Sequence, residues 1–339
     1  MNYRPNAVRA GIEMSIEMPE TSIWNDYWHF DRLASFDDLG ETNYREAVAA
    51  GWKSFLESLP DGASILDLCT GNGAIAVMAA EAGRRSGKHF RIVAVDAADI
   101  NPYLYVTRHR DELAAIEFRP ATPIERLPWP AASFEAVVSQ YGIEYSDLSL
   151  SIPELARVVA PTGKARLVLH AAEGAVVERS RRAIADMDFL LHEVDLAGKA
   201  QHCLRAVAEI ERRMDRSASA LRAARESSDA FQKALQETGQ RVAAAAEPGV
   251  LRNSGKMLDE LYRRRSRYDL ARAIGIAEGI RTEWRNHRGR LTAQIAAAVT
   301  RKERAELAGR LRRSGASEVR ESDQLVSAGL IGHCIEASF

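Results

Sequence analysis

Two acidic side chains mark the ends of short apolar runs, and a glycine-rich turn follows the first of them. Asp67 lies in the apolar run 65–68, and Gly71 and Gly73 follow it before an Ala-rich segment typical of a helix. Glycine lets the backbone approach a ligand closely, so this strand–turn–helix unit predicts a ligand site. The next apolar run ends at Asp96, where a carboxylate can accept hydrogen bonds from ribose hydroxyls. Together the two turns predict a site for an adenosine-type cofactor.

The same spacing also fits a nicotinamide enzyme. Gly71, Gly73 and Ala76 match the dinucleotide fingerprint G-x-G-x-x-A, and Asp96 supplies an acid 23 residues after the second glycine. Asp67 argues against this alternative, because a carboxylate at the end of the first strand would repel a pyrophosphate. The same carboxylate could instead bind an amino group.

Two later segments resemble motifs of class I S-adenosylmethionine (SAM) methyltransferases. Residues 127–139, LPWPAASFEAVVS, resemble the family's LPF-x-x-x-SFD-x-V segment, and residues 153–164, PELARVVAPTGK, resemble its E-x-x-R-V-L-x-P-G-G segment. The resemblance is to the small-molecule, UbiE-like branch and covers residues 42–172 and the C-terminal strands. It implies SAM as the cofactor, S-adenosylhomocysteine as the product and a doubly wound Rossmann-like sheet.

The resemblance places the cofactor across both turns and the loops after the later strands. Asp67 would hold the ammonium group, directly or through water, and Asp96 would bind the ribose. Ile124 would pack on the adenine, although this chain has Ala121 and Thr122 where the family often carries an acid. The expected cofactor residues are Asp67, Cys69, Thr70, Gly71, Gly73, Asp96, Ala97, Thr122, Ile124, Glu125, Gln140 and Tyr141.

The loop after the fourth predicted strand lies beside the transferred methyl group in this family. Methyl transfer is an in-line displacement, so alignment of the acceptor with the sulfonium is the enzyme's first task. An aromatic face favours the cationic sulfonium, which makes Tyr141 a candidate, with Tyr27 and Trp28 as alternatives.

A general base is needed only where the acceptor atom is a protonated oxygen or nitrogen. His170, at the end of the fifth predicted strand, is the first candidate, and Glu144 and His29 follow. Two structural alternatives stay open. His170 could be a hydrogen-bonded histidine at a strand end, and Glu144 could pair with an arginine.

Strands and helices alternate up to His170, which predicts an α/β fold with a doubly wound, mostly parallel sheet. Residues 176–313 carry apolar side chains at helical spacing and predict three to five long helices, as a bundle or an antiparallel coiled-coil arm. Two final runs, 317–320 and 330–337, resemble the last strands of the family, whose final strand inserts antiparallel. The expected organisation is an aromatic lid segment at 1–41, a SAM-binding domain at 42–175, an all-α insertion at 176–313 and the final strands at 314–339.

Charge divides along the chain in the same way. The 339 residues have a formal net charge of −1, yet residues 176–315 hold 29 Lys and Arg against 19 Asp and Glu. Arginines around 263–267 and 281–290 could bind nucleic acid phosphates, but solvated helices are often as basic. Dimerisation, a docked partner protein and a lid over the acceptor are the other uses that we consider for this segment.

Several sequence features favour a cytoplasmic location. The chain shows neither a signal-peptide pattern at its start nor an apolar run long enough to span a membrane. Its three cysteines are far apart and fit no metal spacing, so we expect no metal site and a reducing, cytoplasmic environment. Cys69 is expected to be a small packed residue and not a nucleophile.

These observations lead to one main hypothesis and three alternatives. The main hypothesis is a SAM-dependent methyltransferase that acts on a small or medium organic acceptor, with O- or N-methylation favoured over C-methylation. The alternatives are an RNA or other nucleic acid methyltransferase that uses the basic helices, a non-catalytic methyltransferase-like assembly module, and a nicotinamide enzyme. The acceptor and the oligomeric state are not encoded in any motif that we can interpret.

Overall fold

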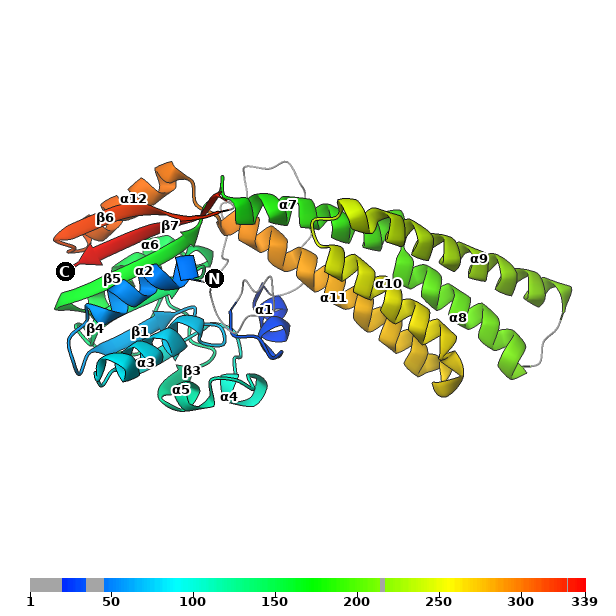
Figure 1. The fold of residues 1–339 in the computed structure, drawn as a ribbon, viewed down its shortest axis with the longest axis horizontal. Coiled ribbons are helices and arrows are strands. Elements are labelled where there is room, and N and C mark those ends of the chain that lie inside the picture. The colour runs from blue at the N-terminus through cyan, green and yellow to red at the C-terminus, as the bar shows by residue number, and fades with distance from the viewer. Residues whose placement is uncertain (1–19, 35–45, 214–216, 328) are drawn as a thin grey trace. The chain divides into compact units, whose positions relative to one another are not determined.

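The computed structural model describes residues 20–34, 46–213, 217–327 and 329–339. The chain forms two compact units, one made of Met1–Val177 with Gln294–Phe339 and the other of Glu178–Ala293 (Figure 1). Thr42, the expected start of a helix, and residues 1–19 and 35–41 of the expected lid segment lie outside the described residues.

The first unit is built on one seven-stranded sheet. Its strands are β1 (Ser64–Leu68), β2 (Arg91–Val95), β3 (Ile116–Arg119), β4 (Phe134–Gln140), β5 (Val159–His170), β6 (Glu318–Val326) and β7 (Gly329–Ser338). They lie in the order β3-β2-β1-β4-β5-β7-β6. Neighbouring strands from β1 to β5 are parallel, whereas β7 runs antiparallel to both β5 and β6. The predicted doubly wound sheet and the antiparallel last strand are therefore confirmed.

Helices cover both faces of this sheet (Figure 1). One face packs against α2 (Glu46–Glu57), α3 (Ala74–Ser86) and α5 (Arg110–Ala114), and the other against α6 (Leu148–Val158) and α12 (Arg301–Arg313). Successive strand residues point to opposite faces, so Ile65 joins the first core and Leu66 the second. With both faces buried, the central strands are apolar along their whole length, as their sequences indicate.

Shorter elements lie near the carboxyl ends of the strands. They are α1 (Glu20–Trp28), α4 (Pro102–Tyr105) and the 3₁₀ turn η1 (Ile143–Tyr145). Residues 97–120, for which the sequence pattern predicts one helix and a short strand, contain two helices, α4 and α5, before β3. Pro102 begins α4 and Asn101 caps it, accepting a hydrogen bond from the Leu104 amide, so the chain forms two short helices there.

The second unit is entirely helical and has its own core. It contains α8 (Leu196–Arg213), α9 (Ala218–Arg241) and α10 (Pro248–Arg263); the chain enters it through α7 (Ala175–Asp188) and leaves through α11 (Leu270–Ala297). A π-helical turn, Phe189–Glu193, follows α7. Phe231, Leu258 and Trp284 are among the side chains that form its buried cluster.

The compact helical unit ends before α12, although the insertion was expected to run to residue 313. Leu307 and Leu311 of α12 are buried in the sheet's second core. The Arg- and Leu-rich composition of α12 is like that of the helical unit, so composition alone could not separate them. None of the helices in the described residues is both long and apolar enough to cross a membrane.

Candidate functional site

The glycine-rich turn between β1 and α3 has the unusual backbone that its sequence requires. Gly71 and Gly73 have φ angles of 54° and 93°, and Cys69 also has a positive φ, of 54°. Left-handed geometry costs little for glycine and more for a residue with a Cβ, so Cys69 holds some strain. Burial raises the pKa of the Cys69 thiol, which agrees with a packed residue and not with a nucleophile.

The buried side chain of Asp67 stabilises this turn through hydrogen bonds. Its side chain is 1% exposed, and Oδ2 accepts hydrogen bonds from Thr70 Oγ1 at 2.6 Å and from the Ala76 amide at 3.2 Å. Burial raises the pKa of this carboxyl to about 7, against the opposing effect of those hydrogen bonds. Asp67 therefore shapes the turn, and its expected contact with the ammonium group, directly or through water, stays a prediction.

Asp96, after β2, links the two turns. One carboxylate oxygen accepts the Gly71 amide and the other accepts the Ala98 amide, each at 2.8 Å. Burial raises the pKa of Asp96, while these two amides lower it. Each oxygen keeps a second lone pair, so the carboxylate can still accept hydroxyl hydrogen bonds. Ala97, next to it, is exposed.

The N-terminal helix α1 packs onto the same turn. A Cβ at Gly71 would overlap the indole ring of Trp28, so only glycine allows this contact. Asn72 lies within the turn and is fully buried; its Nδ2 donates to the carbonyls of Trp28 at 3.0 Å and Arg32 at 2.8 Å. The Trp28 indole ring therefore lies directly over the glycine-rich turn.

The expected adenine-binding residues all contact other parts of the sheet unit or its loops. Thr122 Oγ1 donates to the Pro120 carbonyl, and Glu125 accepts the Asp147 amide at 3.0 Å. Ile124 is 3% exposed within the sheet's second core. The packing of Ile124 leaves almost none of its side chain available to a ring.

The two leading candidates for a base form a buried pair. Glu144 Oε1 accepts hydrogen bonds from the His170 backbone amide at 2.9 Å and is 2.8 Å from the His170 ring Nδ1. Their side chains are 0% and 4% exposed. Glu144 was expected to pair with an arginine if its role were structural. It pairs with His170 because η1 follows β4, and β4 lies directly beside β5.

Tyr141 packs on this pair. Its ring stacks on His170 with a centroid distance of 4.3 Å, and its hydroxyl donates to Gln324 Oε1 at 3.1 Å. The hydroxyl thus faces the β6–β7 hairpin, which favours a role in holding the His170 ring over the expected sulfonium contact. The neighbouring Gln140 accepts a hydrogen bond from the Trp52 indole at 2.6 Å.

His29, the third base candidate, lies elsewhere in the unit. Its Nε2 is 3.0 Å from the Asp99 carbonyl, and its ring stacks on Tyr105 at 4.6 Å. Both partners belong to the segment after β2, whereas His170 ends β5. The contacts of His29 therefore fix the N-terminal segment and do not join the Glu144–His170 pair.

Some site residues gave no sequence signal. Asn72 occupies a variable position of the glycine-rich pattern, and Gln294, whose side chain meets His170 Nε2 at 2.9 Å, lies in an Ala-rich helix 124 residues away. Two buried atoms near the pair, Gln140 Nε2 and Glu144 Oε2, have no hydrogen-bond partner among the described residues. A buried donor and a buried acceptor of this kind are suited to a polar ligand.

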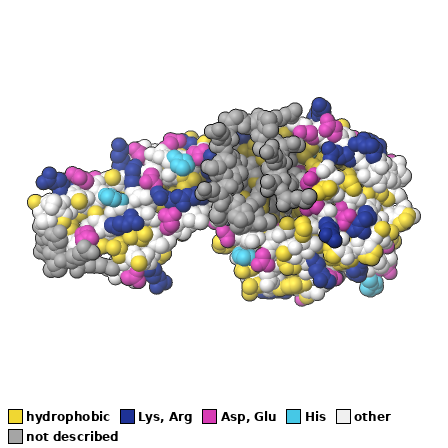
Figure 2. All heavy atoms as spheres, turned by 180° about the vertical axis from the view of Figure 1, so that it is seen from behind, with side chains coloured by type: hydrophobic (Ala, Val, Ile, Leu, Met, Phe, Trp, Pro, Cys, Tyr) yellow, Lys and Arg dark blue, Asp and Glu magenta, His cyan; other side chains and the backbone are white. Residues whose placement is uncertain are grey.

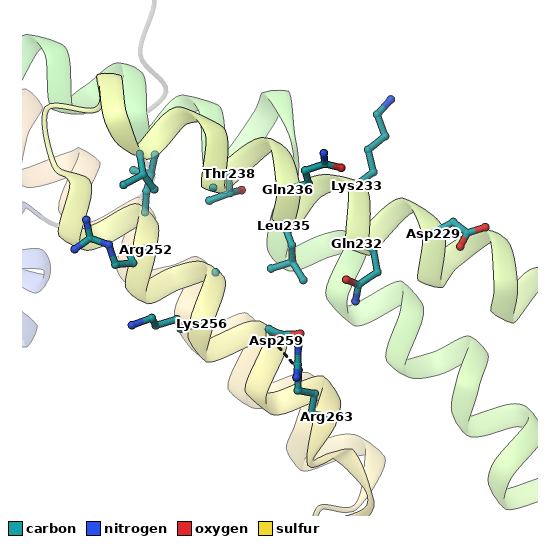
Figure 3. Close-up of a pocket in the computed structure, with 14 residues that line it drawn as sticks. Asp229, Gln232, Lys233, Leu235, Gln236, Thr238, Arg252, Lys256, Asp259 and Arg263 are labelled. Carbon is teal, nitrogen blue, oxygen red and sulfur yellow. Dashed lines mark ion pairs between the residues drawn. The ribbon is translucent and has the colours of Figure 1, made fainter.

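The helical unit carries a separate groove between α9 and α10 (Figure 3). Its volume is about 810 Å³, and Leu235, Gln232 and Asp259 are among its lining residues. None of the residues expected to bind cofactor or acceptor lines it.

Most arginines of the expected basic stretches form ion pairs. Figure 2 shows basic and acidic side chains interspersed over the visible face of the unit. The pairs within the expected basic stretches are Arg263–Asp259, Arg264–Glu260, Arg265–Glu211, Arg281–Asp195, Arg285–Glu278, Arg288–Asp188 and Arg290–Glu283. Such pairing favours the interpretation of a solvated helix surface over that of a phosphate-binding stripe.

Comparison with known proteins gives one family and several distant relatives. A family model described as "Methyltransferase domain" matches residues 65–163. The chain is 29% identical over 140 residues to a 2-phytyl-1,4-naphtoquinone methyltransferase of Thermosynechococcus vestitus; the match covers 41% of this chain and 58% of that protein. The chain thus spans little more than half the length of this relative.

Similar solved structures share lower identity. One is a 1,6-didemethyltoxoflavin-N1-methyltransferase of Burkholderia thailandensis, with 19% identity, a TM-score of 0.31 and coverage of 38% of this chain and 55% of the other. Another is the CMeT domain of a citrinin polyketide synthase, with 11% identity, a TM-score of 0.42 and coverage of 86% and 52%. The family model thus assigns residues 65–163 to a methyltransferase domain, and the strand order of the sheet unit is that of a doubly wound, Rossmann-like fold.

Proposed function

We propose that the whole protein is a SAM-dependent methyltransferase that methylates an oxygen or nitrogen of a small or medium organic acceptor. The observation that carries the proposal is the buried Glu144–His170 pair. It lies at the carboxyl end of β5, on the sheet edge where the glycine-rich turn follows β1. In open α/β sheets this edge is where ligands bind.

Each residue then has a defined task. When bound, SAM supplies an electrophilic methyl group on its sulfonium. Gly71 and Gly73 keep the turn free of side chains, and Asp96 accepts the ribose hydroxyls with its remaining lone pairs. His170 Nε2 would take the acceptor's O–H or N–H proton, so that the acceptor atom could receive the methyl group that bound SAM would supply, with S-adenosylhomocysteine as the leaving group. Glu144 stabilises the resulting imidazolium through Nδ1.

Calorimetric titration with SAM, and with NAD in parallel, tests the cofactor. We expect SAM to bind and NAD not to bind. Asp96→Ala should weaken SAM binding with the fold retained, because it removes the carboxylate that bridges both turns. Asp99→Ala, an exposed aspartate three residues later, is the matched control. Absence of any heat with SAM or S-adenosylhomocysteine would refute the proposed cofactor.

An acceptor screen that measures release of S-adenosylhomocysteine tests the reaction. Phenols, naphthols, the hydroquinone forms of 1,4-naphthoquinones and heterocyclic amines form the panel, since each carries an O–H or N–H and the relative in Thermosynechococcus is named for a naphthoquinone. His170→Gln should lower kcat about 10²- to 10⁴-fold while SAM affinity is unchanged. His89→Gln, at an exposed position, is the control. Wild-type turnover by His170→Gln would exclude the base and leave the cofactor assignment standing.

RNA and assembly functions are tested beside this screen. A nucleic acid methyltransferase should bind RNA with a steep salt dependence that weakens when Arg263, Arg264 and Arg265 become alanine. A dimer or assembly formed through the helices should dissociate to single chains, measured as mass by light scattering, when residues 178–293 are removed. The many ion pairs of the helical unit support the small-acceptor proposal over the RNA alternative.

A further inference from the structure

The end of β5 is held by the segment that follows α11. The Val299 amide donates to the His170 carbonyl at 2.8 Å, and the Ala172 amide donates to the Val299 carbonyl at 2.9 Å. This segment and Gln294, in the last turn of α11, belong to the same compact unit as β5. The backbone near Gln294 is therefore anchored beside His170.

The Gln294 side chain completes a hydrogen-bonded chain through the His170 ring. Its Nε2 lies 2.9 Å from His170 Nε2, and an amide nitrogen can only donate. His170 Nε2 must then be the acceptor, so the ring proton is on Nδ1, which donates to Glu144 Oε1 at 2.8 Å. The direction of the chain is Gln294 to His170 to Glu144.

The surroundings leave the ring little freedom to change this arrangement. Tyr141, at the end of β4, stacks flat on it, and Tyr145 of η1 contacts it edge-on with centroids 6.1 Å apart. Glu144, Tyr141 and Tyr145 are the titratable groups that face the ring, and His170 itself is 3% exposed. A second ligand of Nε2 can therefore approach only by replacing the Gln294 amide.

Resting on the proposed function, we propose that Gln294 is a positioning residue for His170. Its amide fixes the neutral tautomer with the proton on Nδ1 and covers the Nε2 lone pair until the acceptor arrives. The acceptor's hydroxyl or amino hydrogen then takes the place of the amide hydrogen at Nε2. Proton transfer breaks the acceptor's O–H or N–H bond and forms the Nε2–H bond, with no other reactant involved.

Nitrogen NMR of the full chain with ¹⁵N-labelled histidine tests this without cofactor or acceptor. In the wild type we expect His170 Nδ1 to be protonated and Nε2 to be unprotonated and hydrogen-bonded. Gln294→Met keeps the shape of the side chain but removes the donor, so the Nε2 resonance should move to that of an unbonded lone pair. Gln294→Glu replaces the donor with an acceptor and should place a second proton on the ring at Nε2. Thr292→Ala, on the same helix, should change neither resonance.

Two results would overturn the proposal. One is a wild-type ring with its proton on Nε2, and the other is a Gln294→Met ring whose nitrogen resonances are unchanged. If Gln294→Met fails to fold, the wild-type tautomer and Gln294→Glu still decide.

A kinetic test uses an acceptor from the screen. Gln294→Met should lower the KM for that acceptor about 2- to 10-fold, since one competing hydrogen bond is lost. An unchanged or higher KM would show that Gln294 does not compete with the acceptor. Since the NMR needs no SAM, its outcome is separate from that of the calorimetry.

Discussion

The buried carboxyl group of Asp67 holds the glycine-rich turn by hydrogen bonds, and its burial makes the ionised form unfavourable. It is 1% exposed and holds Thr70 and the start of α3 through one oxygen. Its pKa is raised to about 7 because burial penalises the charged form more than its hydrogen bonds favour it. The protonated form is therefore the stable one in the folded protein below neutrality.

A raised carboxyl pKa makes the folded state less stable as pH increases. The stabilising contribution is complete below pH 4 and is lost as pH rises to about 7. Asp67→Asn removes this titration. We expect its free energy of unfolding, relative to wild type, to rise by about 2–3 kcal/mol between pH 5 and pH 8.

Urea unfolding at both pH values, followed by tryptophan fluorescence, measures this difference. The quantity compared is how the difference in free energy of unfolding changes between the two pH values. A pH-independent effect of the new amide on stability therefore cancels. Asp111→Asn, at an exposed position of α5, is the control. A difference between Asp67→Asn and wild type that stays constant with pH would show that Asp67 is ionised in the folded protein at little cost.

Among the elements, α1 and the chain after it are attached to the glycine-rich turn by the side chain of Asn72. Asn72 donates to the carbonyls of Trp28 and Arg32, and the Trp28 indole lies against Gly71. The same segment is also held by the Asp31 carboxylate, which accepts the Thr107 amide at 3.0 Å. The cover over the turn is thus attached by a few polar contacts to the first two βα connections.

Asn72→Ala should loosen this cover. Loss of two buried hydrogen bonds is expected to lower the local opening free energy by about 1–2 kcal/mol, which corresponds to about 5- to 30-fold faster tryptic cleavage after Arg32. Mass spectrometry of timed digests measures the rate at this bond. Cleavage after Arg126 in the same sample, and Asn253→Ala in the helical unit, are the controls. Equal cleavage rates after Arg32 in Asn72→Ala and wild type would mean that Asn72 does not hold the segment.

The elements were largely predictable, whereas the contacts between them were not. Apolar runs predicted the strands, and Gly71 and Gly73 predicted the turn. Both predictions were possible because the spacing of apolar residues and the backbone conformation of glycine are local properties. Glu144 and His170 were both named as candidates, but their pairing depends on the lateral order of β4 and β5, which no local pattern carries. The contact between Gln294 and His170 could not be predicted, because the whole helical unit lies between the two residues in the sequence. The burial of Ile124 and Asp67 was also not apparent from the local sequence, and their expected contacts with the cofactor stay predictions.

Over the whole molecule, the chain divides into two units with different cores and charges. The sheet unit buries two clusters, one on each face, and the helical unit buries a third. Residues 178–293 hold 23 Lys and Arg against 17 Asp and Glu, so the sheet unit carries the excess of acidic side chains. An insertion with its own core can change without disturbing the strands that hold the cofactor turns.

Two compact units predict two unfolding transitions, and only that of the sheet unit should respond to cofactor. S-adenosylhomocysteine at 100 times its Kd should stabilise the sheet unit by about 2.7 kcal/mol, which raises its Tm by about 5–11 °C for a unit of this size. The helical unit should unfold at an unchanged temperature. Differential scanning calorimetry with and without S-adenosylhomocysteine measures both transitions.

Core variants assign each transition to its unit. Leu258 and Leu155 are fully buried in the helical and sheet cores respectively. Leu258→Ala should lower the ligand-insensitive transition and Leu155→Ala the ligand-sensitive one, since such truncations cost about 2–5 kcal/mol. One transition that moves as a whole with every variant and with ligand would show instead that the units unfold together. In that case a substitution in the helical core would also lower the temperature at which the sheet unit unfolds.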